Sequence, residues 1–149
     1  MQLHFEGVKD IEAEFAAAQT TEISHEEDPP FADADLEDIS GWYLNGSGDF
    51  LVGERHGELV TMGGLQKETE TSALVRRMRT RNDVRGRGYG NLLLASLERR
   101  ATDLGYTELI VDPLATNTGA RRFYERAGFR EAEHKTLGRY DIIIYRKSL

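Results

Sequence analysis

Three glycines and several arginines stand directly ahead of a leucine-rich run in RTRNDVRGRGYGNLLLASLERR, residues 79–100. The window from Arg76 to Arg87 contains six arginines and one aspartate, a net charge of +5, whereas the whole chain carries −7 and the remainder therefore −12. A local positive field on an acidic body is suited to binding a small polyanion at one place. A nucleic-acid-binding protein is more often basic over a whole face, so that class is disfavoured.

The glycines explain how such an anion would be held. A predicted strand leads into RGRGYG, residues 85–90, which leads into a predicted helix. The first amides of a helix lack intrahelical partners and carry part of the positive helix dipole, so a phosphate group is bound well there. Glycine lets the loop curl and lets the backbone approach phosphate oxygens; the three are Gly86, Gly88 and Gly90. Arg85 and Arg87 add charge-assisted hydrogen bonds, so the segment predicts a pyrophosphate-binding loop.

The spacing of this loop differs from two common phosphate-binding motifs. A Walker loop requires a lysine after its last glycine, and a dinucleotide-binding fingerprint spaces its glycines G-x-G-x-x-G. The pattern from Arg85 to Gly90 is R-x-x-G-x-G. With a strand before it and a helix after it, this pattern resembles the acyl-CoA-binding motif of the GNAT N-acetyltransferases.

Two further segments strengthen the resemblance to the GNAT family. NTGARRFYERAGF, residues 117–129, is similar to a later family motif that combines Asn, Ala, an aromatic residue before Tyr, Glu and Gly-Phe. FLVGERHGELVTMGGLQ, residues 50–66, resembles the strand pair that precedes the loop. The resemblance extends from about Phe50 to Arg146, and two motifs in this order are more specific than either alone.

The resemblance implies an N-acetyltransferase that transfers an acetyl group directly to a primary amine in a ternary complex. It implies acetyl-CoA as the co-substrate and no metal. The residues expected at the pyrophosphate are Arg85, Gly86, Arg87, Gly88, Tyr89 and Gly90, the last four through backbone amides. The main chain expected to pair with the pantetheine arm is that of Met78, Arg79 and Thr80. An amide near Met78 would polarise the thioester carbonyl, whereas the Met78 side chain is expected in the core.

Two residues of the later motif acquire roles from the resemblance. Asn117 would hydrogen-bond the pantetheine or cap the helix that it begins, and asparagine suits both. Tyr124 would protonate the leaving thiolate; ordinary thiol and tyrosine pKa values differ by about 1.5 units, so complete transfer costs about 2 kcal/mol. The residue pattern alone favours a core tyrosine on an apolar helix face, and the resemblance reverses that preference.

A general base is also required, because an ammonium group cannot attack a thioester. Many relatives carry a glutamate on the third strand, where this chain has Leu74. Three carboxylates remain as candidates, acting directly or through water: Glu68, Glu70 and Asp112. Exposed carboxylates are usually solvated surface groups, so the base stays open. The missing glutamate slightly favours the alternative function, a non-catalytic acyl-CoA-binding or sensor domain.

The elements that position these residues follow from residue periodicity. Extended runs around a short glycine-containing link predict a hairpin over 50–55 and 58–66, followed by a strand over 73–80. A helix over 88–104 and a buried strand over 107–112 complete a right-handed crossover between parallel strands.

The remaining elements complete a mixed sheet. A helix over 117–127 precedes strands over 129–134 and 140–146, and Gly63-Gly64 predicts a bulge or a close backbone approach within its strand. The expected fold class is α/β in the mixed α+β sense, a GNAT-type acyl-CoA N-acyltransferase fold. Its mixed, mostly antiparallel sheet would have about six to seven strands flanked by about four helices.

The first 49 residues are expected to form variable acceptor-side helices of one domain spanning 1–149, with the acyl-CoA-binding core in 50–146. A helix is predicted over 10–18, and a second starts near Asp33 or Asp35 with a buried stripe of Leu36, Ile39 and Tyr43. The acidic residues there either attract a cationic amine or form a solvated helix face, which we favour; they are Asp33, Asp35, Glu37 and Asp38. The acceptor pocket is expected from residues 31–49 and 67–72, and Trp42 lines it or anchors the helix.

Amino-acid composition excludes several kinds of functional site. The chain has no cysteine, which excludes a thiol nucleophile, a disulfide and a cysteine-based zinc site. No apolar run approaches the ~20 residues of a membrane span, and the first residues lack a signal-peptide pattern. We expect a soluble cytoplasmic protein, monomer or homodimer, with a small-molecule or peptide amine as acceptor and no nucleic-acid or membrane partner. Transfer from another CoA thioester is an alternative.

Overall fold

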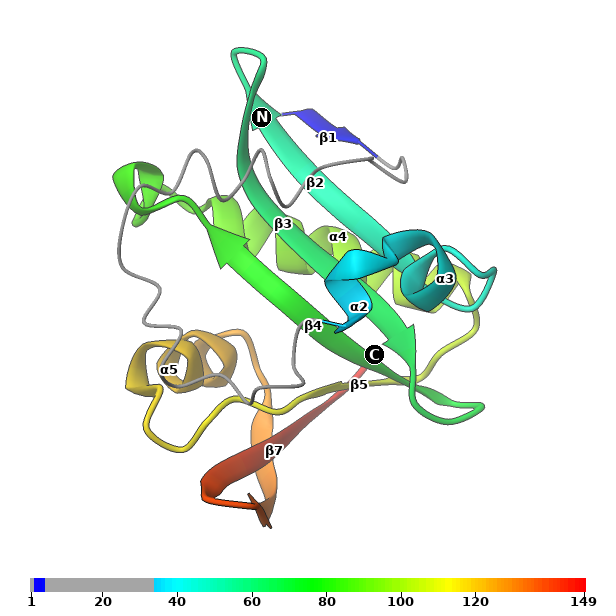
Figure 1. Cartoon of the computed structure of the whole chain (residues 1–149), viewed down its shortest axis with the longest axis vertical. Coiled ribbons are helices and arrows are strands. Elements are labelled where there is room, and N and C mark those ends of the chain that lie inside the picture. Colours follow the sequence, from blue (N-terminus) through cyan, green and yellow to red (C-terminus); the bar gives the residue numbers. More distant parts are fainter. Residues whose placement is uncertain (1, 5–33) are drawn as a thin grey trace.

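The strands that the structure describes form one mixed sheet. The computed structural model describes residues 2–4 and 34–149, so the predicted helix over 10–18 and Asp33 lie outside the described residues. Seven described strands lie in the order β1-β2-β3-β4-β5-β7-β6 (Figure 1). They are β1 (Gln2–His4), β2 (Asp49–Arg55), β3 (Glu58–Lys67), β4 (Ser72–Thr80), β5 (Glu108–Val111), β6 (Arg130–Leu137) and β7 (Tyr140–Ser148).

Helices flank this sheet. The described α-helices are α2 (Ala34–Glu37), α3 (Ile39–Tyr43), α4 (Tyr89–Asp103) and α5 (Thr118–Arg126), and a 3-10 turn, η1 (Asn82–Val84), follows β4. All paired strands are antiparallel except β4 and β5, which are parallel and are connected through α4. The predicted hairpin, crossover and mixed sheet are therefore confirmed. Within the described ranges, no helix is long and apolar enough to cross a membrane.

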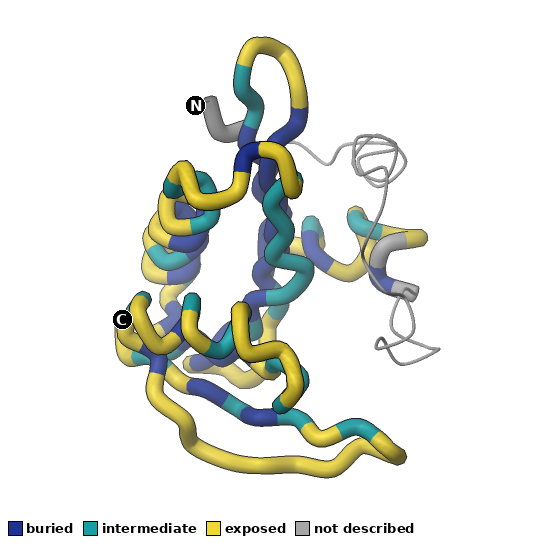
Figure 2. Tube along the Cα trace, turned by 90° about the vertical axis from the view of Figure 1, so that its left-hand side faces the viewer, coloured by how far each residue is buried: buried dark blue, intermediate teal, exposed yellow. Residues whose placement is uncertain are grey.

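Each face of the sheet carries its own apolar cluster. On β2, Leu51 belongs to the cluster under α4 and α5, whereas Phe50 and Val52 pack with Tyr43 of α3. This alternation is the period of two that a strand imposes on its side chains. Figure 2 shows α4 on one side of the sheet and α2 and α3 on the other. The cluster under α4 and α5 includes Tyr124.

The segment predicted as one helix near residue 35 forms two short helices. Asp38 ends the first and caps the second, because its side chain accepts a hydrogen bond from the Gly41 amide at 2.9 Å. Aspartate competes for local backbone donors in this way and is favoured at helix starts. Of the predicted stripe, Tyr43 is fully buried and Ile39 packs against the same cluster, while the side chain of Leu36 is not among those described.

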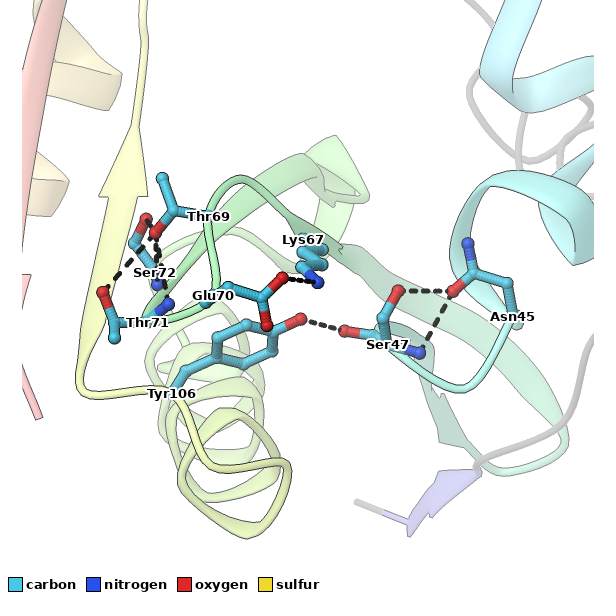
Figure 3. A network of polar contacts seen from close by, with 8 residues as sticks. All are labelled: Asn45, Ser47, Lys67, Thr69, Glu70, Thr71, Ser72 and Tyr106. Carbon is cyan, nitrogen blue, oxygen red and sulfur yellow. Dashed lines mark hydrogen bonds and ion pairs between the residues drawn. The ribbon is translucent and has the colours of Figure 1, made fainter.

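Polar contacts join the turns at the end of the sheet where β4 begins (Figure 3). The Tyr106 hydroxyl, after α4, donates to the Ser47 carbonyl ahead of β2 at 2.5 Å. Between β3 and β4, the Thr69 hydroxyl accepts from the Ser72 and Thr71 amides at 3.0 and 3.2 Å. These groups stabilise the end of the sheet opposite the glycine loop. That residues 67–72 contribute to the acceptor pocket stays a prediction.

Candidate functional site

β4 and β5 pair only over their first residues. The register joins Ser72 to Glu108, Ala73 to Leu109 and Leu74 to Ile110. β4 then continues to Thr80, whereas β5 ends at Val111, and the two strands diverge (Figure 1). Beyond Leu74, no described strand pairs with this edge of β4. Backbone groups on an unpaired edge are a template for another extended chain.

The part of β4 beyond its last pair with β5 contains a bulge. In the register, Met62 of β3 faces Arg79 and Gly64 faces Arg76, so Gly63 lies opposite two residues, Arg77 and Met78. Arg77 has a φ of +58°, a left-handed conformation. A residue other than glycine adopts that conformation at a cost of about 1–2 kcal/mol. A bulge re-aims the groups around it, here within the segment predicted to face the pantetheine arm.

Gly63 and Gly64 make room for large side chains on opposite faces of β3. A Cβ on Gly63 would lie 2.8 Å from the Met78 sulfur, and a Cβ on Gly64 would lie 2.6 Å from the Tyr43 ring. Both separations are too short for real carbon contacts, so a larger residue would force a shift. The predicted bulge is present at this position of the β3–β4 pair, and its extra residue belongs to β4. The groups that lie close to the two glycines are side chains.

The loop between β4 and α4 adopts conformations that suit glycine. Gly86 and Gly88 have φ values of +77° and +85°, and a Cβ on either would meet no atom of the described residues within 4 Å. Conformation therefore requires glycine there, and the described residues leave the space beside both glycines open. Gly90 lies in the first turn of α4, where a Cβ would make ordinary contacts of 3.4 Å with Phe123 and 3.6 Å with Thr80.

The first turn of α4 presents amides without intrahelical partners. Gly88 precedes the helix, and no side chain among the described residues caps it. The first intrahelical hydrogen bond runs from the Leu92 amide to the Gly88 carbonyl at 3.1 Å. The amides from Tyr89 to Asn91 therefore lack a partner within the helix, and the helix dipole adds positive charge around them. Such a helix start binds anions.

The arginines around the loop have two kinds of environment. The ion pairs that the structure describes join Arg77 to Asp35, and Arg81 to Asp83 and Glu58. Arg85 and Arg87 are exposed and form no salt bridge with any residue that the structure describes. The predicted charge of the window is thus partly neutralised by carboxylates distant in sequence, and exposed positive charge remains beside the glycines.

Tyr124 holds a buried hydroxyl on α5. It belongs to the same apolar cluster as Val75 of β4, is 8% exposed, and packs edge-to-face against Phe123 and Phe129. Its hydroxyl makes no hydrogen bond with any described residue. Buried hydroxyls normally have a partner, so this one is available to a bound molecule or water. Burial, and next the charge of Asp112, raises the pKa of Tyr124, so the hydroxyl keeps its proton at neutral pH.

The three candidate bases differ in their surroundings. Asp112 directly follows β5 and is exposed, yet desolvation by the surrounding protein raises the pKa of its carboxyl against the opposing charge of Arg76. Its charge acts on Tyr124, so the two groups share one neighbourhood. The others lie on the exposed turn between β3 and β4: Glu68, and Glu70, which is paired with Lys67 at 2.5 Å.

Asn117 caps α5. Its side-chain oxygen accepts a hydrogen bond from the Ala120 amide at 3.1 Å. The predicted capping role is confirmed, because this bond satisfies one of the first amides of the helix. A contact with pantetheine stays a prediction.

The acidic residues near residue 35 do not form one surface. Asp35 is 2% exposed and is bound by Arg77, so the prediction of a solvated or substrate-attracting side chain is wrong for this residue. The partner lies on β4, far away in sequence, where a local pattern gives no signal. Glu37 is exposed, and Asp38 caps α3. Trp42 on α3 is 42% exposed.

Comparison with known proteins supports a common family. The family model described as "Acetyltransferase (GNAT) family" matches residues 13–129. A mouse protein described as probable N-acetyltransferase family 8 member 5 is 29% identical over 101 residues, which cover 64% of this chain and 44% of the mouse protein. The chain therefore matches less than half the length of this curated relative.

Solved structures share the architecture over nearly the whole chain. An acetyltransferase from Streptococcus agalactiae 2603 has a TM-score of 0.80 at 19% identity, with 99% of this chain and 98% of that chain covered. A GNAT family acetyltransferase from Elizabethkingia anophelis, solved with acetyl-CoA bound, has a TM-score of 0.72 at 17% identity, with 99% and 97% covered. At these identities the likeness establishes the fold, and the predicted GNAT-type arrangement of sheet and helices is confirmed.

Proposed function

The chain belongs to the GNAT family of acetyltransferases, and we propose that it is an acetyl-CoA-dependent N-acetyltransferase acting on a primary amine. One observation carries the proposal: three sets of polar groups follow one another where β4 and β5 diverge. They are the amides that begin α4, the edge of β4 beyond Leu74, and the Tyr124 hydroxyl. An acyl-CoA presents a pyrophosphate, an extended arm with amide groups, and a thioester in the same order.

The residues present fit such a ligand. The amides from Arg87 to Gly90 would bind the pyrophosphate, with the side chains of Arg85 and Arg87 adding charge-assisted hydrogen bonds. The edge of β4 from Met78 to Thr80 would pair with the pantetheine arm as an added strand does. Asn117 would contact the same arm. The bound acetyl-CoA in the Elizabethkingia relative supports this choice of co-substrate.

The chemistry needs few protein groups. The amine nitrogen attacks the thioester carbonyl carbon, the carbon–sulfur bond breaks, and the amine loses a proton. The bulge amide at Met78 would donate to the carbonyl oxygen as negative charge develops there. Tyr124 would donate to the departing sulfur. Because its pKa is raised, complete proton transfer costs more than the about 2 kcal/mol that ordinary values give, so hydrogen-bond donation carries more of the role.

Asp112 is the base that we propose for the amine proton, directly or through water. A carboxyl whose pKa lies above its ordinary value is closer to the range in which a base works at neutral pH. Leu74 occupies the last β4–β5 pair and has no ionisable group, so the base must come from another element. Asp112 lies where β5 ends, at the divergence of the strands.

A second candidate function is a non-catalytic acyl-CoA-binding or sensor domain. Leu74 is the residue that favours it, because many relatives carry a glutamate at that position. The two functions share the binding loop and differ only in turnover with an amine. Residues 31–49, including the exposed Trp42, remain the proposed acceptor side.

Binding and turnover are measured separately. Acetyl-CoA is expected to raise the melting temperature; at 100 times Kd it stabilises by about 2.7 kcal/mol. The release of free CoA thiol in the presence of a panel of small amines and peptides then distinguishes an N-acetyltransferase from a non-catalytic sensor domain. No shift at saturating acetyl-CoA would overturn both functions together.

Tyr124→Phe tests the assigned acid. We expect kcat to fall at least about 100-fold, with acetyl-CoA affinity and melting temperature near wild type, since the hydroxyl has no described partner to lose. Ser96→Ala is the matched control. It removes a buried hydroxyl that donates to the Leu92 carbonyl within α4, so it should lower stability by at most about 1 kcal/mol and leave turnover intact. Full turnover in Tyr124→Phe would remove Tyr124 from the mechanism.

A further inference from the structure

Asp35 and Arg77 form a buried ion pair between α2 and the bulge of β4. The guanidinium donates from Nε to Oδ2 of Asp35 at 3.0 Å and from Nη2 to Oδ1 at 2.5 Å. The two side chains are 7% and 2% exposed. Two parallel hydrogen bonds fix the orientation of the guanidinium as well as its distance, so the pair holds Arg77 rigidly.

The bulge decides which face of the sheet each side chain takes. Val75 belongs to the cluster under α4, and strict alternation would send Arg77 to that same apolar face. Instead Met78 packs against that cluster, and Arg77 reaches Asp35 of α2 on the other face. The extra residue therefore keeps a charge out of the larger core and brings it to Asp35.

Tyr43 and Gly64 support the same arrangement. The Tyr43 ring lies against Gly64, which pairs with Arg76 immediately before the bulge, and the Tyr43 hydroxyl donates to Asp35. Burial alone would raise the pKa of Asp35, but the hydrogen bonds from Arg77 and Tyr43, and the charge of Arg77, outweigh it and lower the pKa. The carboxylate is therefore ionised at neutral pH and binds the guanidinium as a charge.

A left-handed conformation at a residue other than glycine persists only where its surroundings determine it. The register with β3 fixes the backbone on both sides of Arg77, and Asp35 fixes the end of its side chain. The residue that follows is Met78, whose amide lies in the segment that we assign to the thioester carbonyl.

We propose that Asp35 is a positioning residue for the transfer reaction: by clamping the Arg77 guanidinium, it holds the left-handed bulge that aims the amide next to Met78 at the thioester carbonyl. This inference rests on the proposed function. It also couples α2, on the expected acceptor side, to the strand that binds the thioester.

Two variants test whether the clamp acts through backbone conformation. Asp35→Ala is made alone and with Arg77→Gly, because glycine adopts a positive φ without steric cost and leaves no unpaired guanidinium. Using the amine found in the panel and saturating acetyl-CoA, we expect Asp35→Ala to lower kcat about 100-fold. Acetyl-CoA affinity stays within about threefold, since the glycine loop is separate. Adding Arg77→Gly restores kcat at least about tenfold.

Lys147→Gln is the matched control. It breaks another ion pair, between Lys147 of β7 and Glu98 of α4, at 2.7 Å. It is expected to lower the melting temperature and to leave kcat within about twofold. If Asp35→Ala behaves in the same way, the ion pair is only an anchor and the proposal is wrong. A double variant as slow as Asp35→Ala would also overturn it.

A readout without turnover separates this proposal from the proposed function. The amide–α-proton coupling and the Cα chemical shift of residue 77 report its φ in the labelled full chain. We expect left-handed values in the wild type, their loss in Asp35→Ala, and their return in the double variant; Asp35→Asn replaces Asp35→Ala if the latter does not fold. Left-handed values that survive both Asp35 substitutions contradict the clamp, whereas a wild type that fails to bind acetyl-CoA contradicts only the function.

Discussion

The glycine loop and the bulge of β4 both hold the backbone in left-handed conformations, but they use different residues to do so. In the loop, Gly86 and Gly88 adopt positive φ themselves, and the neighbouring Arg87 is exposed. In the bulge, Arg77 adopts positive φ, and Asp35 buries its guanidinium. The presence or absence of a distant carboxylate thus decides what each arginine does: one remains available to a ligand, and the other shapes a strand.

The largest expected effect on stability comes from removing the Arg77 guanidinium, and removal of the Arg87 guanidinium is the comparison. Arg77→Met leaves the Asp35 carboxylate buried without its cation, so the free energy of unfolding should fall by about 3 kcal/mol. Arg87→Met, on the exposed loop, should change it by less than about 0.5 kcal/mol. Urea unfolding at pH 7 measures both. Equal losses would remove the distinction between the two regions.

Glycine substitutions separate conformation from ligand approach within the loop. Gly88→Ala puts a Cβ at a φ of +85° and should cost about 1–2 kcal/mol of stability. Gly90→Ala lies in a helical turn, so stability should hold or rise by up to about 1 kcal/mol. Both should weaken acetyl-CoA binding in calorimetry at least about tenfold, because backbone amides must approach the phosphate oxygens closely. Unchanged affinity in Gly90→Ala would mean that the ligand does not reach this turn.

The exposed arginine should matter for binding rather than for folding. Arg87→Ala is expected to weaken acetyl-CoA binding about tenfold, or about 1.4 kcal/mol, and to reduce the dependence of affinity on salt. Arg139→Ala, on the exposed turn between β6 and β7, is the control for net charge and should leave affinity unchanged. Equal losses in the two variants would indicate a diffuse field instead of a local contact.

The smallest expected effect is the loss, at acidic pH, of the stability that Asp35 contributes at the bulge. The pKa of Asp35 is lowered in the folded state, so its contribution to stability is complete above the unfolded value of about 4 and is lost as pH falls through the folded pKa. The difference in unfolding free energy between wild type and Asp35→Asn should be constant from pH 7 to about 5 and shrink below about pH 4. A difference that persists undiminished to pH 2 would show that Asp35 is not held as a charge.

The loop could be predicted from the sequence because its signal is local. Glycines at fixed offsets, a strand before them and a leucine-rich helix after them lie within one short window, and the structure confirms those elements. The capping role of Asn117 and the buried position of Tyr124 were predicted on the same kind of pattern. Their chemical roles rest on the family and stay predictions.

The bulge arginine and its partner could not be predicted in the same way. Asp35 and Arg77 lie on α2 and β4, and a single extra residue decides which face Arg77 takes. A partial signal does exist: strict alternation from Val75 would place an arginine in the larger core, which a bulge avoids. The division of the predicted helix at Asp38 could not be predicted either, because an aspartate within a helical pattern can lie inside one helix or cap the start of a second.

The central claim is that the glycine loop and the open edge of β4 bind one acyl-CoA. Amide chemical shifts of the labelled full chain, titrated with acetyl-CoA, test it most directly. We predict saturable changes that are largest at residues 86–91 and 76–80, the first set from the diphosphate and the second from the extended arm. Saturation that leaves both sets unchanged, or that moves mainly the amides of β6 and β7, would contradict the account.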